Sequence, residues 1–186
     1  MSAADDLDDG AVVERVVSGQ ANLFRVLVER HQRAVYGMGL SFFRDSDEAA
    51  DFTQDVFLKA YKNLPGFRRQ ARFSTWLYRI AYNTAVNGVK RRRDFLGIAE
   101  NAEFPDYDGP ERQTLRKAAA GAVVEAVAGL PERFRVCVDL FFFYDRSYQE
   151  IEAITSIPVN TVKSHVFRAK KILRERLRDY AEGGVE

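Results

Sequence analysis

The most distinctive side chains of the chain lie between residues 147 and 171, near its C-terminal end. Polar, basic and aromatic residues recur there at helical spacing: Asn160, Lys163, Ser164, Phe167, Arg168 and Lys171. At about 100° per residue they share one side of a helix, and the apolar Val162, Val166, Ala169 and Leu173 share the other. Hydrogen-bond donors, cations and an aromatic ring on one face are the groups that read base edges and hold phosphates in a major groove.

Two short helices must position these side chains. Ser147 and Glu150 have the spacing of a capping box, which predicts a helix beginning at residue 148. Ser-Ile-Pro at 156–158 ends it, and a second helix starts around Val159. A capped helix, a tight turn and a longer basic helix are typical of a helix-turn-helix. The alternative is an ordinary amphipathic surface helix, and the outward position expected for Phe167 weighs against it.

Charges of like sign are gathered in blocks, although the formal net charge is only +1. Residues 45–55 contain five acidic and no basic residues, and residues 66–93 contain eight basic and no acidic ones. Residues 100–111 are again acidic, and residues 159–178 hold seven basic residues against one glutamate. A single block can be a solvated face, but four alternating blocks favour separate surfaces with separate partners.

The basic block 66–93 also contains closely spaced aromatic rings. They are Phe67, Phe73, Trp76, Tyr78 and Tyr82, and arginines stand between them. Single-stranded DNA binding uses this mixture, because cations hold the backbone while rings stack on bases. Trp76 has a competing role as a core residue, which we favour over direct base contact.

Several classes of function are excluded by composition. Hydrophobic residues make up 46% and charged residues 30% of the chain, as in soluble globular proteins. One cysteine, Cys137, and two distant histidines, His31 and His165, offer neither a disulfide framework nor metal-ligand spacing, so we expect no metal or cofactor. The sequence contains no nucleophile–base set and no glycine-rich phosphate loop, so it gives no reason to expect an enzyme. The apolar stretches are too short for a bilayer and no signal peptide precedes them, so we expect a cytoplasmic protein without membrane insertion.

Helical periodicity runs through almost the whole chain and predicts an all-α fold. Residues 24–38 and 49–64 each form an apolar stripe. Asp45 can cap the second helix, with Glu48 in the capping-box position. A third helix is expected over 74–93, and its basic C-terminal end suits the helix dipole.

The stretch 94–112 lacks any period, is acidic and contains proline and glycine, which predicts a flexible linker. The chain then consists of two small helical domains, 1–93 and 113–186. The second begins with an alanine-rich helix near 111–129, and Pro131 fits the first turn of the next helix. That helix is expected to direct four residues into a core: Phe134, Cys137, Val138 and Phe141.

The segment "LPERFRVCVDLFFFYDRSYQEIEAITSIPVNTVKSHVFRAKKIL" resembles the C-terminal domain of bacterial extracytoplasmic-function sigma factors. By itself it is ambiguous, because "TVKSHV" is also similar to the DNA-binding domain of LuxR-type regulators. The N-terminal half contains "RHQ", "DFTQDVFLKAY" and "FSTWLYRIAYN" in the order and spacing of sigma region 2, which LuxR-type proteins lack. A third alternative, an interaction module such as an adaptor helical bundle, would explain neither the helix-turn-helix nor the basic-aromatic segment.

The resemblance implies a specificity subunit that binds core RNA polymerase and directs promoter-specific transcription initiation. It implies that the β′ clamp helices, which are basic, bind Asp51, Gln54, Asp55 and Leu58. It assigns the reading and melting of the minus-ten element to Phe67, Arg68, Arg69, Arg72, Phe73, Trp76, Arg79, Tyr82, Asn83, Lys90 and Arg91. The minus-thirty-five element would be read by Asn160, Thr161, Lys163, Ser164, Phe167, Arg168 and Lys171. Of the residues further along, Lys170, Lys171 and Arg174 would serve phosphates.

Further partners are implied by the resemblance. The second domain would meet the β flap, the linker would thread the RNA-exit region, and an anti-sigma protein would cover the polymerase-binding surfaces. The chain also departs from the family pattern, with Glu152 in place of a small buried residue and Ser156 in place of a glycine. Asn160 replaces a frequent glycine and His165 a frequent arginine. These departures are a reason not to carry a promoter sequence over from relatives.

Overall fold

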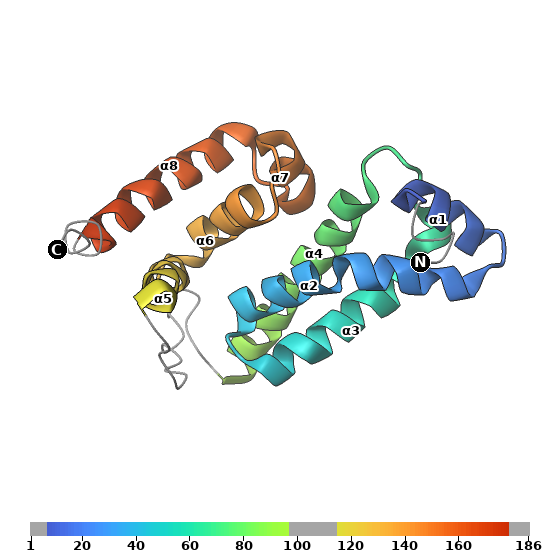
Figure 1. The fold of residues 1–186 in the computed structure, drawn as a ribbon, viewed down its shortest axis with the longest axis horizontal. Helices are drawn as coiled ribbons and strands as arrows, with labels where there is room; N and C mark the ends of the chain where they lie inside the picture. Colours follow the sequence, from blue (N-terminus) through green and yellow to red (C-terminus); the bar gives the residue numbers. More distant parts are fainter. Residues whose placement is uncertain (1–6, 97–114, 179–186) are drawn as a thin grey trace. The chain divides into compact units, whose positions relative to one another are not determined.

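The computed structural model describes residues 7–96 and 115–178, and within these ranges every regular element is helical, as predicted (Figure 1). The chain divides into two compact units. The elements of the first are α1 (Asp9–Val17), the 3-10 turn η1 (Ala21–Leu23), α2 (Phe24–Phe43), α3 (Ser46–Asn63), the 3-10 turn η2 (Leu64–Gly66) and α4 (Phe73–Leu96). Those from α5 onward are α5 (Leu115–Ala128), α6 (Glu132–Val138), the π turn η3 (Asp139–Phe143), α7 (Tyr148–Thr155) and α8 (Val159–Arg176).

In the first unit α2, α3 and α4 pack against one another around a core of fully buried side chains, among them Leu27, Val35, Val56, Leu64 and Leu77. The helix α1 packs on η1 and α2 and also contacts η2. Its valines 12, 13 and 16 are buried. Residues 9–17, for which the sequence pattern predicted no element, are therefore part of the core.

A capping residue marks the start of α3, and a close contact with α2 sets where the two helices cross. Asp45 accepts hydrogen bonds from the amides of Asp47 (2.9 Å) and Glu48 (2.8 Å), which confirms the predicted cap. The Glu48 carboxylate, however, accepts from Arg92 of α4 instead of completing a capping box. At Gly39 of α2, a Cβ atom would lie 2.8 Å from the Phe52 ring, so only glycine permits this crossing of α2 and α3.

The helix α4 differs from its predicted bounds. It begins at Phe73 rather than residue 74 and continues to Leu96, because neither glycine nor proline stands between Gly88 and Gly97. The first three residues of the predicted linker are thus helical, and residues 97–112 of it lie outside the described ranges. The buried positions of α4 are Phe73, Leu77, Tyr78, Ala81, Ala85 and Val89.

In the second unit α6 packs against α8, and a cluster of buried residues joins α5, α6 and α8: Val127, Leu130, Phe134, Val138 and Ala169. Cys137 is fully buried, as predicted, and burial raises the pKa of its thiol to about 11. Pro131 is the N-cap of α6, one position before its predicted place.

Of the four core residues predicted for the helix after Pro131, Phe141 is the one that is not buried. The chain forms a π turn over 139–143, which advances the register and places Leu140 in the core instead. The Phe141 ring stacks on Tyr148 of α7, with centroids 4.8 Å apart. No helix in the described parts of the chain combines the length and apolar character that a bilayer crossing requires.

Candidate nucleic-acid interface and protein-binding face

The helix pair α7–α8 has the predicted local determinants. The Ser147 hydroxyl accepts from the Glu150 amide (3.2 Å), and the Ser147 amide donates to the Glu150 carboxylate (2.9 Å), so the capping box is confirmed. Ile151 and Ile154 are fully buried. Ser156 ends α7 in the left-handed region, with φ 61°, a conformation in which glycine is preferred.

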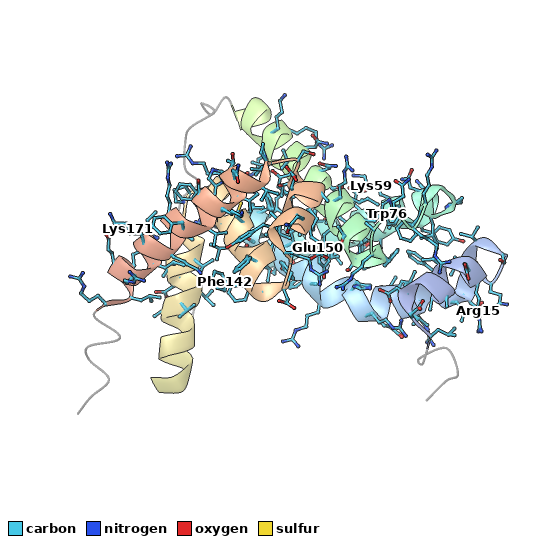
Figure 2. All side chains as sticks on the ribbon, turned by 90° about the horizontal axis from the view of Figure 1, so that it is seen from above. Arg15, Lys59, Trp76, Phe142, Glu150 and Lys171 are labelled. Atoms are coloured by element: carbon cyan, nitrogen blue, oxygen red, sulfur yellow. The ribbon has the colours of Figure 1, made fainter. Side chains whose placement is uncertain are left out.

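The two sides of α8 are as distinct as the periodicity predicts. Val162, Val166 and Ala169 have no more than 1% of their surface exposed. The opposite side is exposed over all seven predicted DNA-reading residues: Asn160, Thr161, Lys163, Ser164, Phe167, Arg168 and Lys171. Phe167 has 72% of its surface exposed among these polar groups. Figure 2 labels Lys171 on this helix.

The structure shows how Glu152 is accommodated at a position where the family usually has a small buried residue. Its side chain is exposed, and its Oε1 accepts a hydrogen bond from the Val159 amide at 3.2 Å. The N-cap of α8 is Pro158, which has no side-chain cap of its own. The first amides of a helix lack intrahelical acceptors and carry partial positive charge, so a carboxylate is favourable there. In the sequence, Glu152 was visible only as a departure from the family pattern.

Two lysines of α8 lie near aromatic rings of the preceding elements. Lys163 Nζ is 5.9 Å from the centroid of Tyr148, and Lys170 Nζ is 5.1 Å from that of Phe142. His165, at the edge of the exposed side, packs its ring on Phe134. Burial, and to a lesser degree the charges of Arg133 and Arg168, lower the pKa of His165.

The loop 67–72 connects η2 to α4 and presents Arg68, Arg69 and Arg72 at the surface. Beneath it, Phe67, Phe73 and Trp76 form a ring cluster with centroid separations of 5.2–5.9 Å. Trp76, labelled in Figure 2, is half-buried in this cluster.

Phe73 requires a correction to its predicted role. Only 3% of its surface is exposed, so its ring supports the loop from below and has no face available for a base. Tyr78 is also buried. The arginines of this segment are exposed, whereas two of its five rings, Phe73 and Tyr78, belong to the core.

Along α4 a line of exposed polar side chains continues from the loop. Arg79, Asn83 and Lys90 are exposed and lie within roughly 40° of one another on the helix. Arg91 is exposed beside them. Tyr82 is half-buried against Phe42, with centroids 6.1 Å apart.

The exposed side of α3 has an acidic half and an apolar half. Asp51 and Gln54 are exposed, and Asp55 is half-buried with its carboxylate 2.7 Å from Lys59 Nζ. Leu58 has 59% and Tyr61 has 44% of its surface exposed. Tyr61 was not among the predicted residues, although its i+3 spacing from Leu58 is visible in the sequence.

A groove of about 550 Å³ lies beside this side of α3, between α3 and α4. Asp51, Asp55 and Glu48 contribute acidic groups to its lining, and Arg91 and Arg92 of α4 contribute basic ones. Within the described residues, no three His, Cys, Asp or Glu side chains gather closely enough to hold a metal ion. The geometry fits binding to other macromolecules.

Comparisons with known proteins match both units. Residues 27–95 match the model of Sigma-70 region 2, and residues 120–173 match that of Sigma-70 region 4. The chain is 38% identical to the RNA polymerase sigma-H factor of Pseudomonas aeruginosa, over 91% of this chain and 93% of the relative. It is 35% identical to the ECF RNA polymerase sigma-E factor of Haemophilus influenzae, over 94% of this chain and 97% of the relative. A solved structure of the sigma factor RpoE from Bartonella quintana, in complex with the anti-sigma factor NepR, has a similar fold, with a TM-score of 0.66 and 23% identity over 83% of this chain and 96% of that one.

Proposed function

Since the chain belongs to the extracytoplasmic-function group of the sigma-70 family, and so directs RNA polymerase to specific promoters, we propose that its three exposed surfaces divide this work. The α8 face reads the minus-thirty-five element, the loop 67–72 with α4 reads and melts the minus-ten element, and the α3 face binds core polymerase. The region 2 match over 27–95 excludes the LuxR-type alternative.

The single observation that supports minus-thirty-five reading best is the two-sided character of α8. Seven exposed side chains lie on the side of α8 opposite three fully buried ones. A capped helix and a tight turn precede α8 in the chain. Lys163 and Arg168 can reach base edges or phosphates, and Phe167 can pack on a thymine methyl group. Lys171 lies further along the helix and serves phosphates.

A salt series on holoenzyme bound to promoter variants tests this division. Lys163→Ala or Arg168→Ala should weaken promoter binding by about 1–3 kcal/mol, that is about 5- to 150-fold, and relax preference at one base pair. Lys171→Ala should weaken all sequences alike and lower the salt slope by about one. If the Lys163 and Arg168 variants bind every promoter as the unmodified protein does, α8 is an ordinary surface helix.

The minus-ten assignment is supported by the basic line that begins in the loop and continues along α4. Arg68 and Arg72 in the loop, and Arg79 and Lys90 on α4, are exposed on the unit that matches region 2. Phe67 and Trp76 are half-buried and provide rings near this line, while Phe73 supports them. Exchange of loop 66–72 for that of a relative should change minus-ten preference and leave minus-thirty-five preference unchanged.

Core binding is assigned to Asp51, Gln54, Asp55 and Leu58 of α3. Three of these side chains are exposed, and the fourth, Asp55, is half-buried beside Lys59. The acidic half complements basic clamp helices, and Leu58 with Tyr61 offers apolar contact at the same helix face. The exposed pair Phe142 and Phe143 of the second unit provides an apolar surface of the kind that the β flap would cover.

Control by an anti-sigma protein is proposed because a sigma factor of the same fold has been solved in such a complex. We expect no catalytic activity, since sigma factors are initiation factors, and we expect a cytoplasmic location beside the polymerase. A purified protein that stays silent with core polymerase until it is modified, with no partner present, would contradict the anti-sigma proposal. Transcription with core polymerase on a promoter library should yield initiation at sequences that share two spaced elements.

A further inference from the structure

The helix α1 lies outside the segment that matches region 2, yet it is packed beside the loop 67–72 (Figure 1). Its N-cap Asp8 accepts from the Ala11 amide at 2.7 Å, and its buried valines hold it on the unit. It contacts η2, the turn from which the loop departs. α1 is thus a fixed part of the unit that can hold the loop.

Arg69, in the middle of the loop, is engaged by two positions of α1. Its guanidinium forms an ion pair with Glu14. At Gly10, one helical turn earlier, a Cβ atom would lie 2.5 Å from a guanidinium nitrogen of Arg69 and 3.4 Å from the guanidinium carbon. The guanidinium therefore lies on α1 between Gly10 and Glu14, and the absence of a side chain at Gly10 leaves room for it.

The backbone of Arg69 has a conformation that such contacts help to hold. Its φ is 58°, in the left-handed region that non-glycine residues seldom adopt. Such a conformation is strained and persists only where the surroundings hold it. The observed contacts of the Arg69 side chain with the described residues are those with α1.

A second link joins α1 to the other end of the loop. Asp9 accepts a hydrogen bond from Arg30 at 3.0 Å, and His31 Nε2 lies 2.7 Å from its other carboxylate oxygen. The His31 ring packs on Phe73, the first residue of α4, with centroids 5.5 Å apart. Through Glu14 and through His31, α1 thus reaches both the middle and the end of the loop.

We propose that Arg69 is a positioning residue that fastens loop 67–72 to α1 through Glu14 and Gly10, and that it is not a ligand of minus-ten DNA. This rests on the proposed function of the loop and divides its arginines by role. Arg68 and Arg72 remain for DNA, while the charge of Arg69 is satisfied within the protein. The assignment of Arg69 to DNA that the sequence favoured is thereby replaced.

The first test measures loop position without DNA. Hydrogen exchange of the amides of residues 67–72 is compared in the full-length protein and in the variants Arg69→Ala, Glu14→Ala and Gly10→Ala. Alanine at position 10 suits a helix, and its Cβ displaces the guanidinium; because this Cβ would also lie 3.2 Å from the N-cap carboxylate of Asp8, circular dichroism must show that the variant keeps its helical content. Each variant should speed exchange of the loop about two- to fivefold, the range that an exposed ion pair supports. Unchanged exchange in Glu14→Ala and Gly10→Ala would overturn the proposal.

The second test uses holoenzyme and a promoter fork that is single-stranded at the minus-ten element. Arg69→Ala, Glu14→Ala and the double variant should each lower affinity by the same few-fold and leave the salt slope unchanged, because all three remove one contact. Arg68→Ala should lower both the affinity and the slope. Glu29→Ala, which removes another exposed carboxylate from the same unit, should change neither.

The outcomes separate this proposal from the proposed function. If Arg69→Ala lowers the salt slope as Arg68→Ala does, or if its effect adds to that of Glu14→Ala, Arg69 binds DNA and the proposal is wrong. If Glu14→Ala raises affinity, Glu14 competes with DNA, which also refutes it. If no loop arginine affects DNA binding, the minus-ten assignment fails, and the exchange experiment alone decides whether Arg69 holds the loop.

Discussion

The contact between Glu152 and the start of α8 gives a quantitative prediction about the recognition helix. Glu152 Oε1 accepts from the Val159 amide at 3.2 Å, and the N-cap residue Pro158 provides no side-chain cap. A carboxylate at a helix N-terminus contributes about 0.3–1 kcal/mol when exposed. Glu152 also lies in the last turn of α7, where a negative charge is unfavourable by the lower part of that range. The net stabilisation is therefore about 0.5 kcal/mol.

The perturbation is Glu152→Gln, which keeps the size and helix propensity of the side chain and removes its charge. A loss of about 0.5 kcal/mol corresponds to a two- to threefold faster exchange of the Val159 amide, measured by NMR. The matched control is Glu175→Gln in the last turn of the same helix. A glutamate there opposes the helix dipole, so its removal should leave exchange unchanged or slow it.

Two results would refute the reasoning. In one, Glu152→Gln leaves the exchange of Val159 unchanged, and the charge of Glu152 contributes nothing in solution. In the other, both variants speed exchange equally, and the effect comes from the net charge of the unit rather than from the position of Glu152.

Three other predictions concern the rest of the chain. The triple variant of Asp51, Gln54 and Asp55 to alanine should keep its helical circular dichroism and lose core polymerase in a pull-down; retained binding would contradict the α3 assignment. Cys137, fully buried and with a pKa of about 11, should react with iodoacetamide at pH 8 only after unfolding, and rapid labelling of the folded protein would contradict its burial. The hydrogen bond from His31, more than that from Arg30, holds the pKa of Asp9 below its ordinary value against the opposing effect of partial burial. The stabilisation from the Asp9 carboxylate should be present above pH 4 and be lost as the pH falls through the lowered pKa of Asp9. In thermal melts, the Asp9→Asn variant should not show this loss of stability at acid pH. If the variant and the unmodified protein have the same pH profile, this account of Asp9 is wrong.

The sequence by itself was sufficient for the helices from α2 onward, for the caps at Asp45 and Ser147, and for the two sides of α8. Asp45, the Ser147–Glu150 box and the spacing of Val162, Val166 and Ala169 are local features, because each depends on residues within two or three turns. The same holds for the order of charged blocks along the chain. Hence the all-α fold and the helix-turn-helix were predictable, and the family resemblance followed from contiguous motifs.

Only the tertiary structure decided which members of a local pattern are buried and which are paired within the protein. Phe73 and Arg69 both belong to the basic-aromatic stretch, but Phe73 packs against His31, and Arg69 pairs with Glu14, which is 55 residues away in sequence. Phe141 lies outside the core, contrary to the prediction, because a π turn shifts the helical register by an amount that the periodicity of the sequence does not reveal. Burial and ion pairing are properties of whichever surfaces meet when helices pack, and contacts between distant segments leave no mark in the spacing of neighbouring residues.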